Sequence, residues 1–139
     1  MPLDNQGLDA AARLVGDRWS LRLVGALLDG DRTFGELSEA VEGIAPTILT
    51  ARLKALQAQG LVVGVPYERR PLRLRYSLTA DGRSLATALA TLSAWGADRE
   101  GHAGGLSLHT TCGGRLETRT WCPTCERVVD DDSDELIWC

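Results

Sequence analysis

The sequence predicts an α+β fold: several short helices, a two-stranded hairpin, a long helix and a small cysteine-bearing module. Three observations predict it. Apolar residues recur at helical spacing as far as Gly60, and two apolar stretches then flank a basic connection that contains proline. All four cysteines follow residue 111. With 139 residues and 44% hydrophobic content, the chain can hold one globular domain and an appendage.

The first part of the chain predicts two helices. Apolar residues at helical spacing between Leu8 and Val15 indicate a short amphipathic helix that ends at Gly16. Ser20 is the expected N-cap of a second helix, which runs to about Asp29. The wide apolar face of this second helix is typical of a buried element and consists of Leu21, Leu23, Val24, Leu27 and Leu28.

A third helix is expected after the turn around Gly30. Thr33 and Glu36 have the spacing of a capping box, which predicts a helix that starts there and continues through Val41. Phe34 and Leu37 would be buried by this helix. Residues 42–43, Glu-Gly, then form a tight turn into the next helix.

The fourth helix, from Pro46 to Gln59, is the strongest functional candidate. Proline suits a first helical turn, and Gly60 suits a left-handed C-terminal cap. Leu49, Leu53 and Leu56 form one apolar stripe, while the opposite face is small, lightly polar and cationic. Two short helices joined by a tight turn, the second with a bare face, are the helix-turn-helix arrangement that reads a DNA groove. An ordinary surface helix is the alternative.

A hairpin with a basic tip follows this helix. We expect strands at Leu61–Tyr67 and Leu74–Leu78, because both stretches have the length and composition of strands. The connection from Glu68 to Arg73 is too basic and too marked by proline for a plain two-residue turn. We therefore predict a protruding wing whose arginines meet phosphates or a minor groove, with a solubilising loop as the alternative.

The distribution of charge supports the same surface. The net charge is −4, but residues 44–83 carry seven Lys and Arg against two acidic residues. Residues 1–43 and 108–139 each sum to −4, and residues 84–107 sum to −1. The only basic block thus coincides with the fourth helix and the hairpin, as expected for a DNA-facing surface. A solvated charged face is the alternative.

A long helix, expected from Ala80 to about Trp95 with Thr79 as its N-cap, is the candidate dimerisation element. Leu85, Leu89, Leu92 and Trp95 form one stripe, and several alanines leave much of the remaining surface small and apolar. A helix with more than one apolar face usually has two partners. We expect one to be the core and the other a second subunit, with the first helix contributing to the homodimer.

Residues 14–95 resemble the HxlR family of winged-helix transcriptional regulators, which are relatives of the MarR type. Residues 15–20, Val-Gly-Asp-Arg-Trp-Ser, are similar to the family's Ile-Gly-Gly-Lys-Trp-Thr. Residues 32–37, Arg-Thr-Phe-Gly-Glu-Leu, resemble its Arg-Phe-x-Glu-Leu. Residues 43–53, Gly-Ile-Ala-Pro-Thr-Ile-Leu-Thr-Ala-Arg-Leu, resemble its Gly-Ile-Ser-x-x-x-Leu-x-x-Arg-Leu, and residues 76–82, Tyr-Ser-Leu-Thr-Ala-Asp-Gly, complete the set. The resemblance implies a dimeric repressor or activator.

One departure from the family concerns oxidant sensing. Some members use a cysteine just ahead of the first helix, whereas no cysteine precedes Cys112 in this chain. The resemblance therefore does not imply that sensing mode here.

Together these patterns predict a sequence-specific regulator that binds double-stranded DNA as a homodimer on an inverted repeat. An alternative is a protein-interaction module that docks on transcription machinery without reading DNA. A small-molecule effector near Trp19, Tyr67 and Trp95 is compatible with the first hypothesis. No catalytic constellation is evident, so we do not expect an enzyme. The residues expected to contact DNA are Thr33, Thr47, Ile48, Thr50, Ala51, Arg52, Lys54, Arg69, Arg70 and Arg73.

A second module is expected after a glycine-rich hinge. We predict a DNA-binding and dimerisation domain at 1–100, a linker at 101–107, and a zinc-ribbon-like module with an acidic tail at 108–139. This module contains one His–Cys pair and one Cys–Cys pair, and in each pair two residues separate the members. The pairs have the spacing of a structural Zn²⁺ site, and a strand is expected between them from Arg115 to Trp121. Disulfide bonds between the cysteines are the alternative to zinc binding. If zinc is bound, Cys139 could replace the histidine as the fourth ligand. The predicted ligands are His109, Cys112, Cys122 and Cys125.

The sequence carries no signal for a membrane or for secretion. No apolar run approaches the roughly 18 residues of a membrane span. The first residues, Met-Pro-Leu-Asp-Asn-Gln-Gly, lack the basic and apolar regions of a signal peptide. We therefore expect a cytoplasmic protein without a membrane partner.

Overall fold

The computed structural model describes residues 5–101 and 108–129. Most of the predicted linker, the acidic tail and Cys139 lie outside these residues. Contacts divide the chain into two compact units. One unit is Asp9–Leu89, and the other combines the N-terminal residues up to Leu8 with the chain from Ala90 onward. The predicted boundary at residue 100 stays a prediction.

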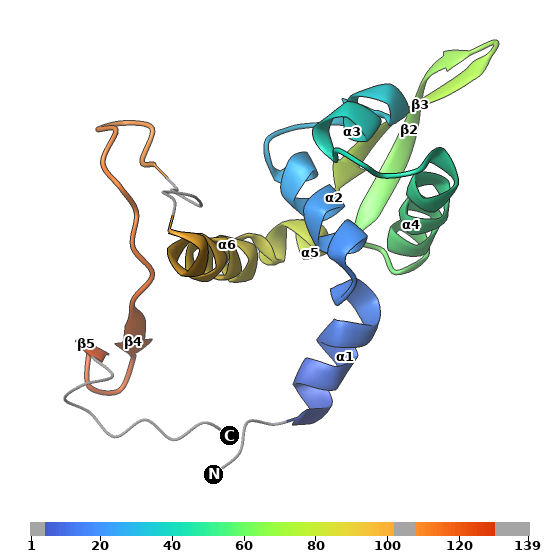
Figure 1. Ribbon diagram of the computed structural model, residues 1–139. Helices are drawn as coiled ribbons and strands as arrows, with labels where there is room; N and C mark the ends of the chain where they lie inside the picture. Colours follow the sequence, from blue (N-terminus) through green and yellow to red (C-terminus); the bar gives the residue numbers. More distant parts are fainter. Residues whose placement is uncertain (1–4, 102–107, 130–139) are drawn as a thin grey trace. The chain divides into compact units, whose positions relative to one another are not determined.

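The Asp9–Leu89 unit consists of helices that cover a small sheet and a hairpin that projects from it (Figure 1). The sheet has the order β1-β3-β2 with antiparallel neighbours. The elements of the first hundred residues are α1 (Asn5–Val15), α2 (Arg18–Leu28), β1 (Arg32–Thr33), α3 (Phe34–Ala40), α4 (Pro46–Ala58), β2 (Val62–Arg69), β3 (Leu72–Leu78), α5 (Ala80–Ser84) and α6 (Ala86–Glu100).

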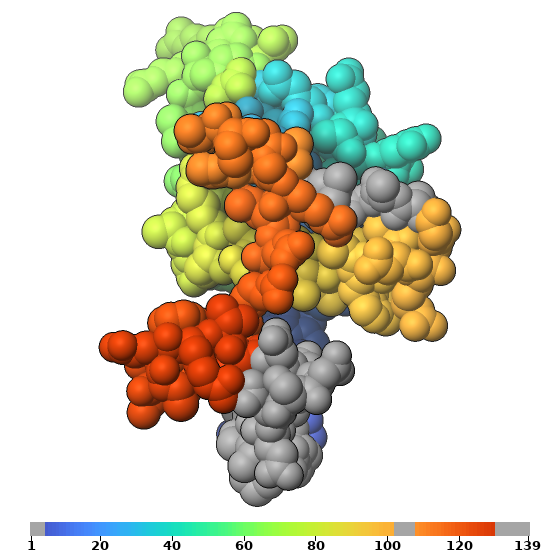
Figure 2. Space-filling model, turned by 90° about the vertical axis from the view of Figure 1, so that its left-hand side faces the viewer, coloured from blue at the N-terminus to red at the C-terminus, as the bar shows by residue number. Residues whose placement is uncertain are grey.

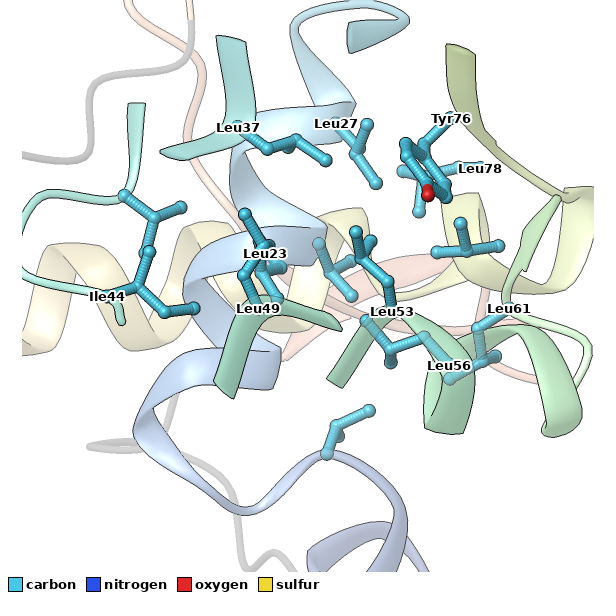
Figure 3. Close-up of a cluster of buried hydrophobic side chains, with 14 residues drawn as sticks. Leu23, Leu27, Leu37, Ile44, Leu49, Leu53, Leu56, Leu61, Tyr76 and Leu78 are labelled. Carbon is cyan, nitrogen blue, oxygen red and sulfur yellow. The ribbon is translucent and has the colours of Figure 1, made fainter. Parts of the chain in front are cut away.

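The core of this unit lies where α2, α3 and α4 meet the sheet. Leucines from the three helices point toward one another and toward Tyr76 and Leu78 of β3 (Figure 3). The apolar stripe predicted for α4 is confirmed, because its three leucines are fully or almost fully buried. At about 25 cal/mol per Å² of apolar surface, this burial is the main force that holds α4 in place. The fully buried leucines are Leu23, Leu27, Leu37, Leu49, Leu53 and Leu56.

The prediction that Ser20 caps the second helix is wrong. Helix α2 begins three residues earlier, with Asp17 as its N-cap, and Ser20 is buried within the helix. The Asp17 carboxylate accepts hydrogen bonds from the backbone N–H groups of Trp19 (3.0 Å) and Ser20 (2.9 Å). A carboxylate at this position satisfies two of the helix's unpaired donors and complements its dipole, so it serves better than a hydroxyl two residues inside.

The predictions for α3 and α4 are confirmed. Thr33 and Glu36 form the reciprocal capping box, with the Thr33 side chain accepting from the Glu36 N–H and the Glu36 carboxylate accepting from the Thr33 N–H. Helix α4 begins at Pro46 and has its C-cap at Gln59. Gly60 follows with φ of 73°, a conformation that glycine adopts without steric penalty.

The hairpin is longer than predicted. Strands β2 and β3 continue to Arg69 and Leu72, so only Arg70 and Pro71 connect them, through a cis peptide bond. The prediction that the connection exceeds a two-residue turn is therefore wrong. Backbone hydrogen bonds between strands do not depend on the polarity of the side chains. The two strands therefore stay paired as far as Arg69 and Leu72, at the charged tip. The sequence also gave no sign of β1, which pairs with Tyr76 and Arg75 of β3.

The long helix predicted from Ala80 to Trp95 is divided in two. Thr79 caps α5 as expected, but α5 ends at Ser84 and α6 begins at Ala86. A Cβ at Gly82 would lie 2.2 Å from the carbonyl oxygen of Leu61. The first turn of α5 is therefore packed closely against the segment that connects α4 to β2. Glycine also lowers helix stability by about 1 kcal/mol relative to alanine, which favours the break nearby.

The described part of the C-terminal module, residues 108–129, contains short strands. Strand β4 (Thr120–Cys122) pairs antiparallel with β5 (Arg127–Val129), and Leu108 forms an isolated bridge with Arg115. Of the strand predicted from Arg115 to Trp121, only Thr120 and Trp121 belong to a strand, and Arg115 forms the isolated bridge with Leu108. None of the helices described is long and apolar enough to cross a membrane.

Candidate nucleic-acid interface

Helix α4 presents a bare face opposite its buried leucines. Thr47, Ile48, Ala51 and Lys54 are all exposed, as the sequence predicts, and Ile48 is 38% exposed. Because these side chains are short apart from one lysine, the backbone of this face can approach a surface closely. A major groove about 12 Å wide admits such a helix.

Two contacts anchor α4 and the turn before it to α2. Arg52 Nη1 lies 3.4 Å from Asp17 Oδ2, and Arg22 Nη1 donates to the Glu42 carbonyl oxygen at 3.1 Å. Arg52 was predicted to contact DNA from the flank of the helix. In the structure its guanidinium is half-exposed and pairs with the N-cap of α2, so it orients α4. Sequence reasoning missed this role of Asp17, because its partner lies 35 residues away.

The surroundings of the Asp17 carboxyl group change its pKa. Burial alone would raise its pKa, but the hydrogen bonds from Ser20, the positive charge of Arg52 and the hydrogen bond from the Trp19 N–H outweigh that effect. The pKa of Asp17 is therefore lowered from its ordinary value. The ionised form is favoured in the folded chain, which makes this contact a pH-dependent source of stability.

Replacing Asp17 by Ala should lower the free energy of unfolding at pH 7 by about 1–2 kcal/mol, since α2 loses its N-cap acceptor. Asn keeps an acceptor but loses the charge, and should cost less than about 1 kcal/mol. Because the folded pKa is lowered, the charge-dependent contribution is present above the ordinary carboxyl pKa and is lost as pH falls through the folded pKa. Urea unfolding of the wild type and Asp17→Asn over this range should show their difference shrinking in acid. A difference that stays constant with pH would contradict this role.

The hairpin of β2 and β3 forms the second part of the interface and is called the wing below. Figure 2 shows the wing in light green, standing out beside the cyan surface of α3. Arg69, Arg70 and Arg73 are exposed on it, and Arg73 Nε lies 3.3 Å from Glu68 Oε2. Among residues 5–101 and 108–129, no ion pair joins Arg69 or Arg70 to a carboxylate. These two guanidinium groups are therefore available to an anionic partner.

Two predicted contact residues already have partners within their own helices. The Thr33 hydroxyl accepts the capping hydrogen bond of α3, and the Thr50 hydroxyl donates to the Pro46 carbonyl oxygen at 2.9 Å. Each hydroxyl would have to share or exchange this bond in order to contact a phosphate or base. The residues best placed for direct contact are therefore Thr47, Ile48, Ala51 and Lys54 on α4 and Arg69 and Arg70 on the wing.

The three aromatic residues suggested for an effector site have different surroundings. Trp19 packs against the core, with the Arg18 guanidinium 4.5 Å from its ring centroid. Tyr67 is exposed and lines an open hollow of about 540 Å³ between the wing and α3, together with Phe34 and Tyr76. Trp95 lies in the other unit and is 62% exposed.

The four predicted metal ligands are present as two separate pairs. His109 Nδ1 lies 3.3 Å from Cys112 Sγ, while Cys122 ends β4 and Cys125 lies in the turn between β4 and β5. The backbone N–H of Cys125 is the largest cause that lowers the pKa of Cys122. Within the described ranges, no three His, Cys, Asp or Glu side chains are grouped closely enough to hold a metal ion. Zinc binding therefore stays a prediction at this point.

Comparisons with known proteins agree with this architecture. A family model for the HxlR-like helix-turn-helix matches residues 14–103. An HTH-type transcriptional regulator of Mycobacterium tuberculosis is 34% identical over 129 residues, which is 91% of this chain and 81% of that protein. Since only 9% of the chain is left out, this similarity extends beyond the family match into the C-terminal module.

Solved structures show the same fold over the first two thirds of the chain. The crystal structure of the HTH-type transcriptional regulator YtcD, a protein of Bacillus subtilis, has a TM-score of 0.64 at 29% identity and covers 68% of this chain and 97% of that one. A transcriptional regulator of the MarR family from Enterococcus faecalis has a TM-score of 0.61 at 31% identity and covers 73% of this chain and 92% of that one. The resemblance inferred from the sequence motifs is thus confirmed, and the chain belongs to the HxlR-like helix-turn-helix family.

Proposed function

We propose that this chain is a sequence-specific DNA-binding transcriptional regulator that acts as a homodimer on an inverted-repeat operator. One observation carries the proposal: a bare helix face and the wing occur in one compact unit. Within residues 5–101 and 108–129, no acidic side chain pairs with Arg69 or Arg70 of the wing. Its relatives in the family are HTH-type transcriptional regulators, which supports the same function.

In this proposal α4 enters the major groove and the wing follows the phosphate backbone or the adjacent minor groove. Lys54 and Thr47 would supply the polar contacts of the helix, while Ile48 and Ala51 would meet thymine methyl groups. Few polar side chains face the groove, so sequence-dependent DNA shape should contribute to specificity. The Asp17–Arg52 pair would position α4 without touching DNA.

Dimerisation is proposed because α1 and α6 each expose large apolar side chains. Leu8 and Leu14 of α1 are exposed, and on α6 Leu92 is 54% exposed and Trp95 62%. Ala97 is the only residue of α6 that is buried. Large exposed apolar side chains on two helices are typical of an interface with a second subunit.

We expect light scattering of the full chain at micromolar concentration to give twice the 15.0 kDa mass of one chain. Replacing Leu92 and Trp95 together by Ser should weaken the dimer by at least about 100-fold, because buried aromatic and apolar anchors often contribute 2 kcal/mol or more each. DNA affinity should fall with it, while the unfolding free energy of the winged-helix unit should stay nearly unchanged.

Leu116→Ser provides the matched control, since Leu116 is equally exposed but belongs to the C-terminal module. It should leave the mass and the DNA affinity as they are. A wild-type chain that remains monomeric at these concentrations, or that binds its operator as one chain per site, would contradict the proposed dimer.

A small-molecule effector is a further partner in this proposal, and the hollow beside Tyr67 is where we place it. Its volume of about 540 Å³ falls in the usual range for ligand pockets, and its walls combine aromatic side chains with Arg73. A ligand there would contact the wing and α3 together, so its binding would change how the wing meets DNA.

A further inference from the structure

The stretch around His109 and Cys112 forms a closed loop that holds both side chains on one side. The His109 N–H donates to the Gly114 carbonyl oxygen at 2.8 Å, and the Gly113 N–H donates to the His109 carbonyl oxygen at 2.7 Å. Gly113 has φ of 67°. The Gly114 N–H points at Cys112 Sγ, 3.4 Å away, so the backbone presents a donor to that sulfur.

The second loop, around Cys122 and Cys125, shares one backbone feature with the first although its sequence is different. Its ends are held by the antiparallel pairing of β4 and β5, in which Cys122 lies opposite Arg127. Glu126 has φ of 53° and is the only non-glycine residue in the described chain with a positive φ. In both loops the residue directly after the second candidate ligand thus takes the left-handed conformation, which costs a non-glycine residue roughly 1–2 kcal/mol.

These loops are ordered without a hydrophobic core of their own. Across residues 108–129 only Cys122 and Val129 are even partly buried, and Trp121 is 56% exposed. Leu108, Leu116 and Val128 are exposed as well. A segment this small cannot offset the entropy of folding by burial alone, so it needs a covalent or metal crosslink. The three described cysteines are free thiols.

We propose that His109, Cys112, Cys122 and Cys125 bind one structural Zn²⁺, which joins the two loops into a single folded module. The Gly114 N–H that points at Cys112 Sγ would stabilise a thiolate there, which is the form that binds zinc. Binding releases up to three thiol protons, and the resulting site of three thiolates, one neutral imidazole and Zn²⁺ has a net charge of −1. With four protein ligands the coordination sphere is closed, so the metal holds structure and performs no chemistry.

The geometry of the first loop identifies the coordinating nitrogen of the histidine. Nitrogen and sulfur ligands of one tetrahedral zinc lie about 3.6 Å apart, given bond lengths of about 2.0–2.1 Å and 2.3 Å. His109 Nδ1 lies 3.3 Å from Cys112 Sγ, close to this separation, so Nδ1 is the nitrogen that would coordinate the metal. A small rotation of either side chain brings the two atoms to the coordination distance.

The test uses the reduced full-length chain purified without chelator, with zinc measured by elemental analysis and Co²⁺ as a spectroscopic probe. We expect about one zinc per chain and the visible absorption of tetrahedral thiolate-bound Co²⁺. Cys122→Ser should lower zinc affinity by more than about 100-fold, the upper end of what losing an outer-sphere partner costs. Cys139→Ser is the matched control and should keep full zinc binding. DNA binding is measured separately, because the zinc site does not depend on the proposed regulatory function.

Glu126→Gly tests the loop without touching a ligand. Glycine adopts the observed φ without strain, so this variant should bind zinc as tightly as the wild type or severalfold more tightly. Three results would overturn the proposal: no zinc in the reduced wild type, zinc binding that survives Cys122→Ser, or zinc binding that Glu126→Gly abolishes. Zinc retained by His109→Ala but lost by Cys139→Ser would overturn the ligand set in favour of four cysteines.

Discussion

Replacing Arg69 and Arg70 together by Ala is expected to weaken binding to every DNA sequence by roughly 60-fold per chain at 0.1 M salt, because each phosphate contact contributes about 0.9 to the salt exponent. Both side chains are exposed at the tip of the wing. The slope of log K against log salt should fall by about 2 per chain. Fluorescence anisotropy titrations on operator and random duplexes, at four or five salt concentrations, measure both quantities.

Arg13→Ala is the matched control, because it removes an exposed arginine from the last turn of α1, outside the basic block. It should change neither affinity nor slope appreciably. Lys54→Met should behave differently from the wing variants by altering the preference at particular base pairs, by roughly 1–3 kcal/mol if a direct bond is lost. Equal losses on operator and random DNA for Lys54→Met would contradict this division between helix and wing.

Leu53→Ala should destabilise the winged-helix unit by about 2–5 kcal/mol, since Leu53 is 2% exposed and its removal leaves a cavity under the recognition helix. That is a large share of the 5–15 kcal/mol that typically separates folded from unfolded domains. Urea unfolding followed by far-ultraviolet circular dichroism should show a lower midpoint with an unchanged slope.

Ile48→Ala serves as the control on the same helix, because Ile48 belongs to the exposed face of α4. Its stability cost should stay below about 1 kcal/mol, although it should change DNA affinity. If Ile48→Ala destabilised the chain as much as Leu53→Ala, the assignment of buried and groove-facing sides of α4 would be wrong.

The elements that local chemistry specifies were predictable from the sequence. The Thr33 capping box and the span from Pro46 to Gly60 have local signals at their ends, and the structure confirms both. The start of α2 was less certain, because Asp17 and Ser20 are both good N-cap residues and lie only three positions apart. Asp17 caps the helix through the Trp19 and Ser20 N–H groups, and it also pairs with Arg52, a partner that the linear sequence cannot reveal.

Features that depend on distant contacts could not be predicted in this way. The close approach of Gly82 in α5 to the Leu61 backbone is such a contact, and β1 exists only because Arg32 and Thr33 lie beside β3. The length of the wing strands depends on backbone pairing between β2 and β3. The charged residues at the tip are not typical of strands, so the sequence did not indicate this pairing. At the proposed metal site the spacing of the candidate ligands was evident from the sequence, but the left-handed conformation of Glu126 was not.

Selection of bound sequences from a random DNA pool by the full-length chain tests the central proposal most directly. A dimeric winged-helix regulator should enrich an inverted repeat whose half-sites lie about 34–36 Å apart, or a multiple of that distance, since each α4 occupies one major groove. The Lys54→Met variant should enrich a repeat that differs from the wild-type repeat at defined positions. A pool that shows no enrichment, or an enriched motif without a dyad, would contradict sequence-specific DNA binding by a homodimer.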